Sequence, residues 1–352
     1  MVRGMKVLVV GGTLLLAGCG GSLPSEPRPP ALAIARLSYA DDGTLLAASR
    51  GRIVRLDSAL NEIDRTVPPF PFDPEVARPG LMYIGISRDG RVATLAWQND
   101  KNPPETPTLT AGGIVFGVPS GELLRLDDYS EAPSEFAGLF LSPDGLTTAA
   151  VDARQVQVVD VAGTFRWQSP KAWFSPRFTS DSAALLVATR TELELVSASD
   201  GAHLTTIVPP SNPYGLLEIA FSADGTTAAV HAVSDEGLGT ITTWRVSDGA
   251  LLRTIAMPAD LTGGYPYAIA LSPNADLIAL SYVPGGTDAL LVWSGDRLLY
   301  RRDGETDFAV AFSPDGSTLA TASRTRGVQL FRANDGVLIT ERILLLDTPR
   351  GL

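Results

Sequence analysis

The chain of 352 residues contains one cysteine, Cys19, so it cannot form an internal disulfide. It contains two histidines, His203 and His231, too few for a metal site built from several imidazoles. No Gly-x-Ser-x-Gly segment, the nucleophile elbow of many hydrolases, occurs in it. We therefore predict no catalytic residues, no metal ligands and no cofactor, and we expect the protein not to be an enzyme.

Basic residues are also scarce. The chain has 28 lysines and arginines against 39 aspartates and glutamates, for a formal net charge of −11. A surface with this balance repels phosphate backbones. Nucleic acid is therefore not expected as a partner.

The first eighteen residues have the pattern of an export signal. Arg3 and Lys6 give a basic start, and Val7–Leu16 is an apolar run too short to cross a bilayer as a permanent helix. Small residues then precede Cys19. We expect residues 1–18 to be removed as a signal peptide.

The segment Leu16-Ala17-Gly18-Cys19 resembles the lipobox of bacterial lipoproteins. The resemblance implies that Cys19 becomes the N-terminus and carries acyl chains, and several chains anchor a protein firmly to a membrane. Gly20 stands where an aspartate would favour retention at the inner membrane, so the implied location is the outer membrane, facing the periplasm. Residues 19–31 are small, polar and rich in proline, and we interpret them as the acylated cysteine and a flexible tether.

A turn signal of the form Ser-Pro-Asp-Gly recurs between apolar segments, as in FSPDGSTLATAS at Phe312–Ser323. The copies are separated by about 45 residues on average, which is the period of four-stranded propeller blades. Proline sets φ for the first central position of such a turn, and glycine accepts the positive φ that follows. Ser182 and Ala275 replace that glycine in two copies. The third position of the turn signal is an Asp or Asn in all seven copies: Asp42, Asp89, Asp144, Asp181, Asp224, Asn274 and Asp315.

A second hairpin signal follows each turn, most clearly in ITTWRVSDGALLRTI at Ile241–Ile255. Two hairpins per repeat predict a four-stranded antiparallel meander, whose strands we name A to D in chain order. We therefore predict an all-β fold, a seven-bladed β-propeller over residues 32–352, with six or eight blades as alternatives. Val337–Leu346 is expected to supply the outer strand of the last blade.

The segments FSPDGSTLATAS and TTWRVSDGALLRTI resemble the inner-strand and outer-hairpin patterns of the WD40 repeat family, and the resemblance extends over Leu32–Leu346. Two features differ from the family pattern. No repeat has the Gly-His pair, and the Trp-Asp ending is replaced by Trp244-Arg245 and Trp293-Ser294. The resemblance implies the fold and leaves the function open, because propellers have many activities.

The long irregular segments all belong to the B–C and D–A connections, whereas the A–B and C–D turns are short. Binding residues concentrate on loops held by a rigid scaffold. We predict a protein-docking surface on the loop face, although such loops can also be aromatic and polar simply because they cover the ends of a β core. The candidate binding residues are Phe70, Phe72, Tyr129, Tyr214 and Tyr265.

The sequence therefore favours a membrane-anchored periplasmic β-propeller lipoprotein that serves as a non-enzymatic binding platform. Its expected partners are the membrane, through lipid-modified Cys19, and other proteins of the bacterial envelope. The alternative is a propeller enzyme or a small-ligand or glycan binder, similar to a lactonase, that uses the central channel.

Overall fold

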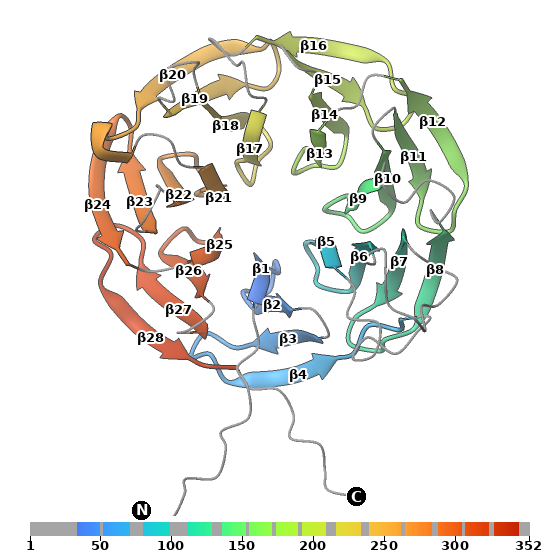
Figure 1. Cartoon of the computed structure of the whole chain (residues 1–352), viewed down its shortest axis with the longest axis horizontal. Coiled ribbons are helices and arrows are strands. Elements are labelled where there is room, and N and C mark those ends of the chain that lie inside the picture. The colour runs from blue at the N-terminus through green and yellow to red at the C-terminus, as the bar shows by residue number, and fades with distance from the viewer. Residues whose placement is uncertain are drawn as a thin grey trace, which may run out of the picture.

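The computed structural model describes residues 34–49, 52–70, 80–98, 111–128, 136–152, 155–170, 174–188, 192–208, 216–233, 239–261, 265–283, 288–304, 307–323 and 327–344. These residues form seven four-stranded antiparallel sheets arranged around a central axis (Figure 1). Within each sheet the spatial order of the strands is their order in the chain. The predicted seven-bladed β-propeller is confirmed, and the alternatives of six or eight blades are excluded.

The strands of the first four blades are as follows. Blade 1 has β1 (Ile34–Tyr39), β2 (Leu45–Ser49), β3 (Arg52–Leu56) and β4 (Glu62–Thr66); blade 2 has β5 (Gly80–Ile86), β6 (Val92–Gln98), β7 (Ala111–Gly117) and β8 (Leu123–Asp128). Blade 3 has β9 (Phe136–Leu141), β10 (Thr147–Asp152), β11 (Val156–Asp160) and β12 (Phe165–Ser169); blade 4 has β13 (Phe174–Phe178), β14 (Ala184–Ala188), β15 (Leu193–Ser197) and β16 (His203–Ile207).

The remaining three blades follow the same pattern. Blade 5 has β17 (Leu216–Phe221), β18 (Thr227–Val233), β19 (Gly239–Arg245) and β20 (Ala250–Ala256), followed by a 3-10 turn, η1 (Ala259–Leu261). Blade 6 has β21 (Tyr265–Leu271), β22 (Leu277–Val283), β23 (Ala289–Ser294) and β24 (Arg297–Asp303); blade 7 has β25 (Asp307–Phe312), β26 (Thr318–Ser323), β27 (Gly327–Arg332) and β28 (Leu338–Arg342). Within the described ranges, no helix has the length and apolarity needed to cross a membrane.

The ring closes without exchanging a strand between the first and last blades. Strand β1 lies beside β25, and the outer strand of blade 7 is β28, inside the predicted Val337–Leu346 segment (Figure 1). Apolar packing holds this junction: Leu45 and Val54 of blade 1 belong to one buried cluster with Leu330 of blade 7. The Arg342 guanidinium adds a hydrogen bond to the Leu60 carbonyl at 2.8 Å.

Every blade contains two β-bulges at equivalent places, one between strands A and B and one between strands C and D. In blade 5, for example, they lie between Leu216 and Glu218 and between Thr243 and Trp244. A bulge increases the local right-handed twist of a strand pair. The bulges therefore add twist at equivalent places in all seven blades.

A side-chain hydroxyl fastens the A–B turn in blades 2 to 7. In blade 3 the Ser142 hydroxyl donates to Asp144 Oδ1 at 2.5 Å and accepts a hydrogen bond from the Thr147 N–H at 2.9 Å. Asp144 Oδ1 also accepts the N–H of Leu146 at 2.9 Å. The Ser142 hydroxyl and one Asp144 oxygen thus accept the hydrogen bonds of two backbone N–H groups in the turn. The equivalent hydroxyl residues are Ser87, Ser142, Thr179, Ser222, Ser272 and Ser313.

Blade 1 lacks this hydroxyl because Ala40 occupies its place. Asp42 still accepts the Thr44 N–H at 2.9 Å and the Thr44 hydroxyl at 2.6 Å, but it receives no hydroxyl from two residues earlier. The turn of blade 1 is therefore held by fewer bonds than the other six.

The glycines of the A–B turns have the predicted positive φ, for example 82° at Gly43 and 71° at Gly316. Ser182 and Ala275, which replace glycine, adopt the same conformation with φ of 63° and 58°. The ring therefore imposes one turn geometry on all seven repeats, including those whose side chains disfavour it.

We expect Ser142→Ala to lower the free energy of unfolding by about 1–2 kcal/mol, because it removes a buried hydroxyl and leaves the Asp144 carboxylate and the Thr147 N–H short of a partner. Chemical denaturation of Ser142→Ala and of the exposed control Ser247→Ala measures this. Ala40→Ser, which supplies the missing hydroxyl to the blade 1 turn, should raise the free energy of unfolding. Equal effects of Ser142→Ala and Ser247→Ala would contradict a structural role of the turn hydroxyl.

Ala275→Gly should raise the free energy of unfolding by about 0.5–1 kcal/mol, because glycine adopts a φ near 58° without strain. Gly43→Ala is the matched control, since its φ is 82° and a Cβ there would meet no atom within 4 Å. It should destabilise by a similar amount through backbone strain alone. If Ala275→Gly destabilises the protein in thermal or chemical unfolding, the turn is not strained.

Candidate functional site

In a four-stranded meander the A–B and C–D turns lie at one end of the blade, and the B–C and D–A connections lie at the other. We call the first end the short-turn face. Two hollows of the described chain open there, one on each side of the blade 1 turn. This is the opposite face from the one predicted to carry the docking residues.

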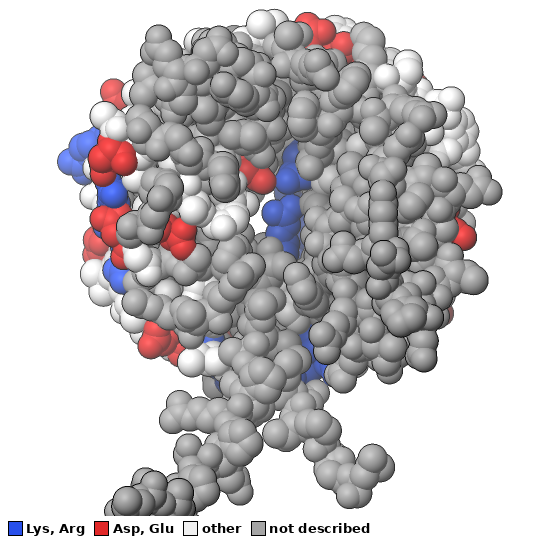
Figure 2. All heavy atoms as spheres, viewed as in Figure 1, with Lys and Arg blue, Asp and Glu red and all other residues white. Residues whose placement is uncertain are grey.

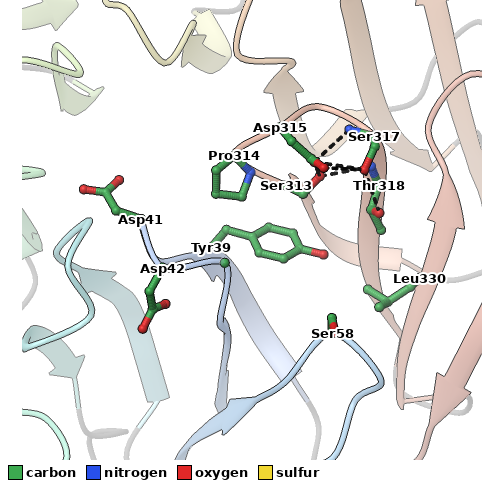
Figure 3. A pocket seen from close by; sticks show the side chains of 11 residues that line it. Tyr39, Asp41, Asp42, Ser58, Ser313, Pro314, Asp315, Ser317, Thr318 and Leu330 are labelled. Carbon is green, nitrogen blue, oxygen red and sulfur yellow. Dashed lines mark hydrogen bonds between the residues drawn. The ribbon is translucent and has the colours of Figure 1, made fainter.

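The first hollow lies between blades 7 and 1, where the ring closes, and has a volume of about 440 Å³ (Figure 3). Tyr39 at the end of β1 lies between the Asp41–Asp42 turn and the blade 7 turn that contains Pro314 and Asp315 (Figure 3). Ser58 contributes from the C–D turn of blade 1. The hollow thus combines one aromatic ring with three carboxylates.

The Tyr39 phenol is the aromatic group of this hollow. Burial, and secondarily the charge of Asp315, raise the pKa of Tyr39 well above its usual value. Both causes disfavour the phenolate. The side chain therefore remains a neutral hydroxyl and can donate a hydrogen bond into the hollow at neutral pH.

Two of the carboxylates are held in the ionised form. The hydrogen bonds from the side chain and backbone of Thr44 lower the pKa of Asp42. The Ser313 hydroxyl, followed by the backbone and hydroxyl of Ser317, lowers the pKa of Asp315. Arg55 lies 3.8 Å from Asp42 and Arg88 lies 3.6 Å from Asp41, and each offsets part of the charge of its partner. With Asp315 added, three carboxylates face these two guanidinium groups, so the hollow keeps a negative charge at neutral pH and favours a cationic group.

The second hollow lies between blades 1 and 2 and has a volume of about 490 Å³. It shares Asp41 and Asp42 with the first, and Arg55, Arg91 and Pro119 contribute to its lining. The Arg55 guanidinium lies 3.0 Å from Asp64 and 3.8 Å from Asp42. The blade 1 turn is therefore a ridge between one acidic hollow and one hollow of mixed charge.

Arg88, in the A–B turn of blade 2, reaches across the axis of the ring. Its guanidinium donates to the Ala223 carbonyl of blade 5 at 3.1 Å and lies 3.6 Å from Asp41 of blade 1. Its backbone N–H donates to the Pro143 carbonyl of blade 3 at 2.6 Å. Arg88 thus connects the turns of blades 1, 2, 3 and 5 at the short-turn face.

The inner strands of blades 4 and 5 are joined by an ion pair. Arg177 of β13 lies 3.6 Å from Glu218 of β17 and also lies over the Phe140 ring, 5.5 Å from its centroid. Figure 2 shows basic and acidic side chains at the central opening of the ring. Within the described ranges, no three His, Cys, Asp or Glu side chains gather closely enough to hold a metal ion.

Phe70 is the one predicted docking residue whose side chain is described. It is half-buried, packs against the core of blade 2 and meets Trp97 edge-on, with ring centroids 6.2 Å apart. This position gives Phe70 a packing role between blades 1 and 2.

The other predicted site residues are not brought together by the described structure. Tyr265 begins β21, and its side chain is outside the described part. Cys19, Phe72, Tyr129 and Tyr214 lie outside the described residues, as do the predicted signal peptide and tether. Their proposed roles stay predictions.

The hollows of the short-turn face were not predicted, although the sequence contains one signal for them. The turn of blade 1 reads Ala-Asp-Asp-Gly, whereas three others read Ser-Pro followed by Asp or Asn. Asp41 thus adds a second carboxylate where those three turns have proline, and Asp41 lines both hollows.

No protein-family model and no curated protein sequence matches the chain. Among solved structures, it is similar to the crystal structure of the Cps50 (Swd1) β-propeller domain of Myceliophteria thermophila, with a TM-score of 0.62 and 15% sequence identity. The match covers 84% of this chain and 95% of that domain. The chain has a WD40-like β-propeller fold. At this identity, the similarity carries no information about what the propeller binds.

We expect Phe70→Ala to lower the free energy of unfolding by about 1–2 kcal/mol, because it removes a half-buried ring that packs on Trp97. Phe165→Ala is the control, since Phe165 is 53% exposed on the outer strand β12 and its loss should cost less. Equilibrium unfolding compares the two variants. A larger loss for Phe165→Ala would contradict the packing role of Phe70.

Proposed function

We propose that this propeller is a lipid-anchored, non-enzymatic binding platform that docks other proteins of the bacterial envelope. Cys19 anchors it to the outer membrane on the periplasmic side, and residues 19–31 connect the anchor to the ring. Anchoring raises the effective concentration of partners that share the same membrane.

The observation that carries this proposal is the pair of hollows on the short-turn face, which share the blade 1 turn. In the first hollow, Ser313 and Ser317 fix the blade 7 turn through Asp315, and the Thr44 N–H and hydroxyl hold Asp42 in the blade 1 turn. A surface that is ordered before binding loses little conformational entropy when a partner docks.

The chemistry of the first hollow favours a lysine or arginine side chain of the partner. Asp41, Asp42 and Asp315 supply negative charge, and the Tyr39 ring supplies an apolar wall. A cation beside an aromatic ring and carboxylates is a common anchor in protein interfaces. The predicted aromatic residues of the loop face remain a second candidate docking surface on the same platform.

Crosslinking and co-purification from native membranes test the function. The wild type should capture defined envelope proteins, and Cys19→Ser should reduce capture by releasing the propeller from the membrane. Asp41→Asn with Asp42→Asn should abolish capture if the short-turn face is the docking surface. Asp248→Asn with Asp296→Asn removes the same charge from the C–D turns of blades 5 and 6 and should leave capture unchanged.

A third variant, with alanine at Phe72, Tyr129 and Tyr214, examines the loop face. If capture is lost only in this variant, the docking surface is the loop face that the sequence predicted and not the short-turn face. If the anchored wild type captures no defined protein, the platform proposal fails. Substrate and ligand screening of the central channel, the enzyme or small-ligand alternative, would then be the appropriate course.

A further inference from the structure

The buried histidine of blade 5 is the feature of the ring that the proposed function does not use. His231 lies in β18, is 0% exposed, and occupies the same side of the strand as Ala229, which packs against blade 6. Its ring meets Tyr282 of β22 at a centroid distance of 5.8 Å. His231 therefore lies in the interface between blades 5 and 6.

The imidazole is closely enclosed and makes no hydrogen bond. Neither Nδ1 nor Nε2 has a partner among the residues that the structure describes. A Cβ built on Gly239 of the adjacent strand would lie only 3.0 Å from Nε2, so the backbone of β19 passes close to the ring. A protonated imidazole at this position would have two buried N–H donors and a positive charge without hydration.

The described acidic groups on the elements around His231 are already paired with arginines. Glu218 lies opposite His231 in the β17–β18 register, but its carboxylate pairs with Arg177 of blade 4 at 3.6 Å. Asp260 of η1 is 61% exposed and pairs with Arg301. The described titratable groups on the elements packed around His231 are Glu218 on β17, Arg245 on β19, Arg253 on β20, Asp260 on η1, Tyr267 on β21 and Tyr282 on β22.

We propose that His231 makes the interface between blades 5 and 6 acid-sensitive, because uptake of a proton favours an opened state in which the imidazolium reaches water. This behaviour is a property of the ring itself and does not depend on the docking proposed above. It would loosen two neighbouring blades while the other five keep their packing.

The direction of the pH dependence follows from the burial of the ring. Burial lowers the pKa of His231 from 6.5 to about 4. Because the opened state restores the higher value, it binds the proton more readily than the closed state. The interface is therefore fully stable above pH 6.5, loses stability as the pH falls below that value, and reaches its full loss near pH 4.

The first test uses the unaltered full-length protein, in which two histidines give a simple imidazole NMR spectrum. His203 is exposed on β16, whereas the signal of His231 should remain that of a neutral imidazole well below pH 6.5. Titration of His231 near pH 6.5 in the closed ring would overturn the proposal, because the ring would then be hydrated.

The second test is hydrogen exchange on the wild type, His231→Gln and the matched control His203→Gln. In the wild type, protection factors of β18 and β22 should fall by about 70-fold between pH 7.5 and 4.5 relative to β10 in blade 3. His203→Gln should behave like the wild type, and His231→Gln should lose this difference. An equal fall in all blades, or the same fall in His231→Gln, would contradict the proposal. The NMR titration keeps the proposal testable if His231→Gln does not fold.

Discussion

Each blade of this protein is a sheet with two apolar faces, and both faces must be covered by other blades. Inner strands such as β2 (Leu45–Ser49) are buried along their whole length, and the buried clusters extend from one blade into the next. Burial of apolar surface is the main favourable term in folding. In an open row of such sheets, the first and the last blade would each expose one apolar face to water. The closed ring buries both of these faces, because blade 1 packs against blade 7.

Closure of the ring also creates the candidate site. Tyr39 and Asp315 are separated by most of the chain, yet they line the same hollow because blade 1 packs against blade 7 (Figure 3). The turn hydrogen bonds hold the walls of that hollow, and Arg88 ties the turns of blades 1, 2, 3 and 5 together near the axis. The fold and the proposed docking surface thus depend on the same packing between blades.

Periodicity made most of the fold predictable. The spacing of the turn Asp and Asn residues predicted seven blades, and the Val337–Leu346 segment predicted the outer strand of the last blade, which is present as β28. The positive φ of Gly43 and Gly316 followed from the turn type. These features were predictable because each depends on residues that are near one another in the chain.

Features that depend on contacts between distant residues were not predictable. The positive φ of Ala275 is imposed by the ring and disfavoured by its own side chain. Phe70 was predicted as a docking residue from its position in a loop, but its contact with Trp97 depends on how blade 2 packs. The first hollow forms only where blade 1 packs against blade 7, which the sequence does not show. The role of the turn hydroxyls became evident from their repeated hydrogen bonds to the Asp side chains of the turns.

The central claim is that a partner docks on the short-turn face around the blade 1 turn. The most direct measurement is site-specific photocrosslinking in native membranes, with a photoreactive residue in place of Ser58 in the first hollow and, as reference, in place of Ser247 in the C–D turn of blade 5. The account predicts a defined protein adduct from position 58 and none from position 247. Adducts of equal yield from both positions, or no adduct from position 58, would contradict it.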